Sequence, residues 1–138
     1  MRILGIDYGD SRVGVAITDM LGITAQGLET IDYNGNDKLL LKRLDEIIFK
    51  YEIEVIALGM PLNLKGEETV RAKITRDFLH KLKCKYPKLK IELVDERLTS
   101  VQAHKTMNDL GIKKRKKKEI VDTLAAVYIL ETYINTQK

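Results

Sequence analysis

The sequence has little of the material that disulfide frameworks, zinc sites and rigid linkers require: one cysteine, two histidines, two prolines and no tryptophan. A single cysteine, Cys84, excludes an internal disulfide and a cysteine-based metal cluster, and two scattered histidines give zinc little to bind. No apolar run approaches the roughly 20 residues that a membrane-spanning helix needs. The chain begins directly in a predicted strand, without the apolar core of a signal peptide. We therefore expect a cytoplasmic protein without membrane contact.

The composition that is present favours a globular protein with its own core. Of the 138 residues, 44% are hydrophobic and 32% are charged, which allows a sizeable core to be buried without cross-links. No repeat, low-complexity segment or linker divides the chain. We expect residues 1–138 to form a single domain.

Positive charge is concentrated in one stretch of the sequence. Residues 113–118 read KKRKKK, and the remaining 18 basic residues are outnumbered by 20 acidic ones. A run of like charges is often only a solvated loop, but it is also typical of segments that contact a polyanion. The predicted nucleic-acid contacts of this stretch are Lys113, Lys114, Arg115, Lys116, Lys117 and Lys118.

The hydrophobic pattern predicts three strands, followed by helices that alternate with strands. The expected strands are residues 2–7, 12–18, 23–31, 54–59 and 90–94. The expected helices are residues 37–51, 70–82, 100–110 and 119–134. This order implies an α/β fold with a mixed five-stranded sheet, in which an antiparallel meander of the first three strands is followed by parallel strands, with helices on both faces.

Three carboxylates fall where such a fold would bring them together. Asp7 ends the first strand, Glu96 follows the last strand, and Asp122 lies in the first turn of the last predicted helix. The helix face that starts at Asp122 continues through small and apolar residues, so we expect it to be buried against the sheet. Each acid also has a simpler interpretation: Asp7 as a turn cap, Glu96 as a partner of Arg97, and Asp122 as a favourable charge near a helix N-terminus.

Carboxylates that share one crevice repel each other strongly unless a cation neutralises them. Oxygen ligands in this number suit Mg²⁺ or Mn²⁺. Beside a basic segment, a metal held by carboxylates indicates hydrolysis of phosphodiester bonds. We therefore expect Asp7, Glu96 and Asp122 to be metal ligands and catalytic residues.

The sequence resembles the YqgF family in four stretches that occur in the family's order: GIDYGDSRVGVAITD, ALGMPLNLKGEET, VDERLTSVQA and VDTLAAVYILETYI. Members of this family are described as Holliday junction resolvases and as nucleases that mature the 5′ end of pre-16S rRNA. The resemblance covers nearly the whole chain. It implies an RNase H-like fold and a metal-dependent nuclease, and the family's acidic positions match Asp7, Glu96 and Asp122.

Other residues of these motifs are candidates for contact with the nucleic-acid backbone. Arg12 and Arg97 could each bind a phosphate, although Arg97 could instead anchor Glu96. The loop after the fourth strand could bring Asn63 to the same edge of the sheet, or it could be an ordinary connection. Asp95 is the alternative ligand to Glu96, because neighbouring residues of a strand point to opposite faces.

The leading hypothesis is a nuclease for structured RNA, by resemblance the precursor of 16S rRNA, either bare or in a ribosomal particle. A DNA junction resolvase would use the same site, and its two symmetric cuts would require a homodimer rather than a monomer. A non-catalytic RNA-binding module would need the basic stretch but not the carboxylates. An ATPase of the actin and sugar-kinase kind also opens with a D-x-G hairpin, but it needs two such domains.

Overall fold

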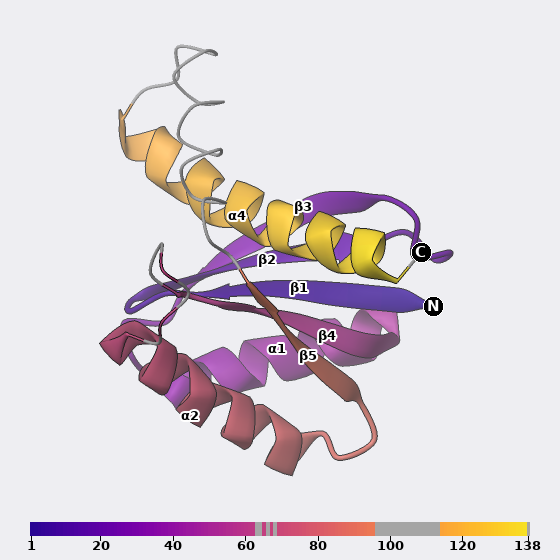
Figure 1. Cartoon of the computed structure of the whole chain (residues 1–138), viewed down its shortest axis with the longest axis horizontal. Helices are drawn as coiled ribbons and strands as arrows, with labels where there is room; N and C mark the ends of the chain where they lie inside the picture. Colours follow the sequence, from indigo (N-terminus) through magenta and orange to yellow (C-terminus); the bar gives the residue numbers. More distant parts are fainter. Residues whose placement is uncertain (63–64, 66, 68, 96–113, 138) are drawn as a thin grey trace.

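The computed structural model describes residues 1–62, 65, 67, 69–95 and 114–137, and for residues 114–122 it describes the backbone alone. The strands and helices follow one another in the order shown in Figure 1. In chain order they are β1 (Arg2–Tyr8), β2 (Arg12–Thr18), β3 (Ala25–Asp32), α1 (Asp37–Tyr51), β4 (Ile53–Met60), α2 (Val70–Lys85), β5 (Lys90–Asp95) and α4 (Lys114–Thr136). The predicted helix at residues 100–110 lies outside the described residues.

The strands form one mixed sheet in the order β3-β2-β1-β4-β5. The first three strands pair antiparallel, and β4 and β5 join β1 as parallel strands. Figure 1 shows α4 on one face of this sheet and α1 with α2 on the other. The predicted five-stranded α/β fold with helices on both faces is therefore confirmed.

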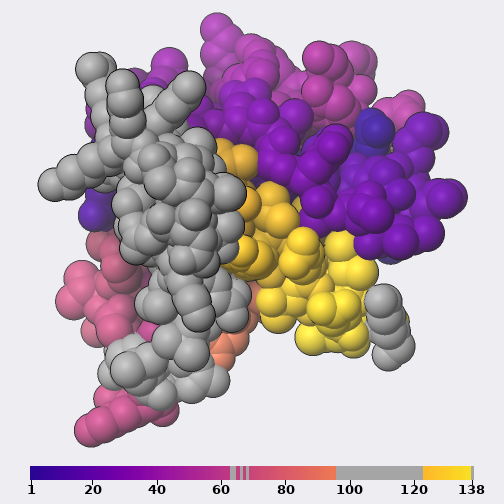
Figure 2. Space-filling view, turned by 90° about the horizontal axis from the view of Figure 1, so that it is seen from above, coloured from indigo at the N-terminus to yellow at the C-terminus, as the bar shows by residue number. Residues whose placement is uncertain are grey.

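A hydrophobic core lies on each face of the sheet. The core beneath α1 and α2 contains large side chains such as Ile6 and Phe78. The core beneath α4 contains smaller ones, including Ala16, Ala57 and Ala126. Small side chains allow the helix and the sheet to approach closely. Figure 2 shows α4 (orange to yellow) from above, next to the violet residues of the opening strands. Within the described parts of the chain, no helix combines the length and apolar character needed to cross a membrane.

The last helix begins earlier than the sequence pattern predicts. It starts at Lys114 rather than at residue 119, so the backbone of most of the basic run forms helix and not a loop before it. Lysine and arginine are good helix formers, and this preference outweighs the repulsion between neighbouring cations. Asp122 consequently lies near the third turn of α4 and not in the first.

The third strand begins at Ala25, two residues later than predicted. The turn before it occupies those residues because the Asp19 carboxylate accepts a hydrogen bond from the Ile23 amide at 2.8 Å. Gly22 in the same turn has a positive φ of 72°, which glycine adopts without a Cβ clash. The strand therefore cannot extend back through this turn.

Candidate metal and nucleic-acid site

Asp7 lies at the carboxyl end of β1 and is only partly buried. Its partner across the antiparallel ladder is Gly14 of β2, and Gly14 in turn pairs with Thr30 of β3, so these three residues form one row across the sheet. Alternation along β1 places Asp7 on the same face as Ile3 and Gly5, which is the face that α4 covers. Because Gly14 has no side chain, β2 puts no bulk beside the Asp7 carboxylate.

The path of α4 brings the position of Asp122 to the same end of the sheet. A Cβ on Gly5 would lie 2.9 Å from the Ala126 carbonyl oxygen, so helix and strand touch there. The end of α4 lies near the start of β1, where Ile3 and Tyr133 line one groove, so the two elements run in opposite directions (Figure 1). The step from Gly5 to Asp7 covers about 6.6 Å, and the four helical residues back from Ala126 to Asp122 cover about 6 Å. The backbone positions of Asp7 and Asp122 therefore converge at one rim.

A side-chain contact on the next residue of α4 fixes this register independently. The hydroxyl groups of Thr123 and Thr30 are 3.0 Å apart and share a hydrogen bond. Thr30 belongs to the row that contains Asp7, so Thr123, the first residue of α4 with a described side chain, lies over that row. The helix is thus held in register from two strands, at Gly5 and at Thr30.

The third predicted ligand, Glu96, directly follows β5 and lies outside the described residues. The pairing and packing of β5 do show the orientation of Asp95, the alternative ligand. Val94 packs into the core beneath α4, so Asp95 has the opposite orientation, opposite Met60 and away from the face of Asp7. This alternation disfavours Asp95 as a partner of Asp7 in a shared metal site.

The predicted nucleic-acid contacts are only partly covered by the structure. Arg12 is half-buried on β2 and shares the face of Gly14 and Asp7. The other predicted contacts lie outside the described side chains: Asn63, Arg97, Lys113, Lys114, Arg115, Lys116, Lys117 and Lys118.

The donor set fits a hard divalent cation. Carboxylate oxygens are the ligands that Mg²⁺ prefers, and Asp7 offers one such group at the rim. The close packing of α4 on β1 places the backbone of Asp122 near the same rim. Among the side chains that the structure describes, no three acidic, histidine or cysteine residues form a metal cluster. The ligand set of Asp7, Glu96 and Asp122 therefore stays a prediction.

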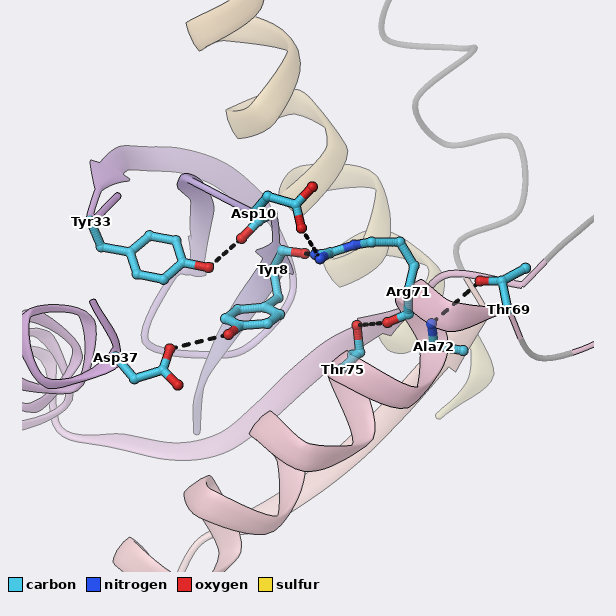
Figure 3. A network of polar contacts seen from close by, with 9 residues as sticks. Tyr8, Asp10, Tyr33, Asp37, Thr69, Arg71, Ala72 and Thr75 are labelled. Atoms are coloured by element: carbon cyan, nitrogen blue, oxygen red, sulfur yellow. Dashed lines mark hydrogen bonds and ion pairs between the residues drawn. The ribbon is translucent and has the colours of Figure 1, made fainter. Parts of the chain in front are cut away.

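The turn that follows Asp7 is held in place by Arg71 from the first turn of α2 (Figure 3). Its guanidinium group donates hydrogen bonds to the Asp10 carboxylate and to the Tyr8 carbonyl oxygen. The same group lies 5.6 Å from the centre of the Tyr8 ring. From the other side, the Tyr33 hydroxyl donates to the Gly9 carbonyl oxygen. The rim of the site is thus held from α2 and from Tyr33, which directly follows β3.

Tyr8 is partly buried and packs against other side chains of the protein. Its ring stacks on Phe78 with centroids 4.1 Å apart and planes 5° from parallel. Its hydroxyl donates to Asp37 at 3.1 Å. Burial, assisted by the neighbouring Tyr33 and Asp37 side chains, raises the pKa of Tyr8 well above its ordinary value, so the hydroxyl stays a neutral donor.

Sequence reasoning missed Arg71, although one signal was available. A cation in the first turn of a helix is disfavoured by the helix dipole, which indicates that a specific partner holds it there.

We expect Arg71→Ala to lower the free energy of unfolding by about 1–2 kcal/mol, because the Tyr8 carbonyl oxygen loses a charged donor. Asp10→Ala should cost less than about 0.5 kcal/mol, because the Asp10 side chain is 82% exposed and water replaces the ion pair. Urea unfolding of both variants checks this order, and equal losses would contradict it.

The mixed sheet in the order β3-β2-β1-β4-β5, with helices on both faces, defines the RNase H-like fold, and solved structures share this fold. The chain is similar to the Thermus thermophilus RuvC structure with a TM-score of 0.56 and 14% identity, over 99% of this chain and 97% of that one. It is similar to the fowlpox virus Holliday junction resolvase with a TM-score of 0.59 and 14% identity, over 100% of both chains. At these identities the likeness shows the fold alone.

Sequence comparison identifies the family. The family model RuvX, described as Holliday junction resolvase, matches residues 1–136, and the chain belongs to this family. A relative from Acetivibrio thermocellus is 45% identical over 137 residues, which are 99% of this chain and 97% of the relative. A relative from Ruminiclostridium cellulolyticum is 51% identical over 135 residues, which are 98% and 94%. Both are named "Putative pre-16S rRNA nuclease". The predicted YqgF (RuvX) membership is confirmed, and it places the chain among nucleases that act on nucleic acid.

Proposed function

We propose that this chain is a metal-dependent nuclease that hydrolyses phosphodiester bonds in structured RNA, with the 5′ region of pre-16S rRNA as its substrate. The observation that carries this proposal is the convergence of Asp7 and the Asp122 position at one rim of an RNase H-like sheet. The names of the relatives support the rRNA substrate.

In this proposal Asp7, Glu96 and Asp122 hold the metal through carboxylate oxygens. When bound, Mg²⁺ or Mn²⁺ supplies Lewis-acid polarisation of the phosphate and a water molecule of lowered pKa. Arg12, on the same face as Asp7, holds a phosphate group beside the scissile bond. The basic residues 113–118 bind phosphates of the RNA further from the scissile bond, through charge and independently of the RNA sequence. The remaining contacts proposed for the nucleic-acid backbone are Asn63 and Arg97.

Metal removal is the direct test of this function. We expect the purified chain to cleave a 16S rRNA precursor fragment in the presence of Mg²⁺ and to lose this cleavage completely with EDTA. Restoring Mg²⁺ in excess should restore it. Cleavage that persists in EDTA would contradict the metal dependence, and binding without cleavage under all conditions would instead indicate a non-catalytic RNA-binding module.

A Holliday junction resolvase is the second candidate, and the description of the family model favours it. Resolution requires two cuts related by two-fold symmetry, so this function predicts a homodimer in solution. A four-way DNA junction incubated in parallel with the RNA separates the two candidates. Symmetric Mg²⁺-dependent cleavage of the junction, by a protein that leaves the RNA intact, would overturn the RNA proposal.

A further inference from the structure

A groove lies between β3 and α4, beside the predicted metal site. Its volume is about 500 Å³. Its walls combine hydroxyl, charged and apolar groups, supplied by Arg12, Gly27, Thr30, Asp32, Thr123, Leu124 and Val127. Except for Arg12, none of these residues was a sequence-based candidate, and none of them is a predicted metal ligand.

The groove lies near the rim that carries Asp7. Thr30 is in the same row of the sheet as Asp7, two strands away through Gly14. Two strand spacings are about 10 Å, which is within reach of a nucleotide next to a phosphate held at Asp7. Arg12 belongs to both places, since it shares the face of Asp7 and lines the groove. A nucleic-acid strand that leaves the rim on this side therefore enters the groove.

An irregularity in β3 is what turns Thr30 into the groove. The register between β2 and β3 shifts between Val15 and Ala16, so Glu29 pairs with Val15 while Gly27 pairs with Ala16. Glu29 contacts Arg43 of α1, on the other face of the sheet. Because of this bulge, Gly27 and Thr30 face the same side although they are three residues apart. The bulge thus places the Thr30 side chain so that it faces Thr123.

The paired hydroxyl groups suit one chemical feature of a nucleic acid, the ribose 2′-hydroxyl. Thr30 and Thr123 are 3.0 Å apart at their Oγ1 atoms, with Leu124 and Val127 as apolar walls nearby. A hydroxyl has two acceptor lone pairs in addition to its proton, so a threonine that already donates can still accept from a ligand hydroxyl. The 2′-hydroxyl is the group by which a protein distinguishes RNA from DNA at a given site.

We propose that this groove binds the ribonucleotide next to the scissile phosphate, and that the Thr30–Thr123 pair recognises its 2′-hydroxyl. Arg12 holds the phosphate on the side of the rim, and the apolar wall of α4 lies against the sugar. This inference rests on the proposed RNA nuclease function and gives it a basis for choosing RNA over DNA.

The test compares the affinity of the full chain for an RNA oligonucleotide and for the DNA of the same sequence. Fluorescence anisotropy in EDTA measures binding in the absence of metal-dependent cleavage. We expect the native protein to prefer RNA by about fivefold, which corresponds to one ordinary hydrogen bond. Thr30→Val and Thr123→Val keep the side-chain shape and remove a hydroxyl, so each should bring the preference close to one. Thr123→Ser retains the hydroxyl and should retain the preference.

Thr132→Val is the matched control, because Thr132 is exposed on the same helix and its hydroxyl donates to the Tyr128 carbonyl oxygen away from the groove. It should keep the full preference for RNA. The proposal is overturned if the native protein binds both oligonucleotides equally or binds neither, or if both valine variants retain the native preference. These outcomes are independent of cleavage, so they leave the metal test of the nuclease function unaffected. A lowered affinity for both oligonucleotides at an unchanged ratio would show a structural role only, and would also overturn the proposal.

Discussion

Asp7→Asn is expected to reduce Mg²⁺-dependent cleavage by about a thousandfold while leaving the fold intact. The amide keeps the shape of the side chain but removes the charge that holds the cation. Loss of several kcal/mol of charge stabilisation corresponds to a decrease of about 10³ in rate. Because Asp7 is partly exposed at a strand end and not in either core, the free energy of unfolding should change little. Single-turnover cleavage and urea unfolding measure the two quantities separately.

Asp77→Asn is the control for this experiment, because Asp77 is an exposed aspartate on α2 away from the rim. It should cleave at the native rate. RNA binding by Asp7→Asn should persist, since contacts with the backbone are made by the basic residues. If Asp7→Asn cleaves as fast as the native protein, Asp7 is not a metal ligand and the proposed catalytic site is wrong.

Gly5→Val is expected to give the largest loss of stability. A Cβ at this position would lie 2.9 Å from the Ala126 carbonyl oxygen and 3.0 Å from Leu130 Cβ, so a larger side chain must push α4 away from β1. Overpacking of this kind costs about 1–3 kcal/mol, and the cost is at the upper end when the obstacle is backbone. Since α4 carries Asp122, the displacement should also reduce cleavage, even in molecules that remain folded.

Gly27→Ala is the matched comparison for this prediction. Its Cβ would lie 2.1 Å from the methyl carbon of Thr123, which a change of the Thr123 rotamer can move at the cost of the hydrogen bond to Thr30. The Ala126 carbonyl oxygen, in contrast, cannot yield without moving the helix. We therefore expect Gly27→Ala to lower the midpoint of urea unfolding less than Gly5→Ala does, with Gly5→Val below both. Equal midpoints for Gly5→Val and the native protein would show that α4 does not lie this close to the sheet.

Most of the fold follows from patterns within short segments. Alternation in VGVAIT predicted β2, and apolar residues at helical spacing predicted α1, whose bounds Asp37–Tyr51 agree with the predicted residues 37–51. The Asn36 side chain caps this helix by accepting hydrogen bonds from the amides of Lys38 and Leu39. These signals are reliable because the residues that produce them are neighbours along one element.

The start of α4 is a boundary that such local patterns do not predict correctly. The periodic apolar face begins near residue 119, but the helix begins at Lys114 because helix propensity needs no apolar face. Similarly, alternation predicted that Asp95 and its neighbour point to opposite faces, but only the packing of Val94 decided that Asp95 points away from Asp7.

By itself, the sequence determined the family, the order of the strands and helices that the structure describes, and the acidic residue at the end of the first strand. Each of these follows from short motifs and patterns among residues that are neighbours along the chain. The tertiary structure alone decided that Arg71 fastens the turn after Asp7, 63 residues from Tyr8. It alone decided that a bulge in β3 turns Thr30 toward Thr123, which is 93 residues away. Contacts over such separations depend on register, helix direction and side-chain volume together, and no local pattern records that combination.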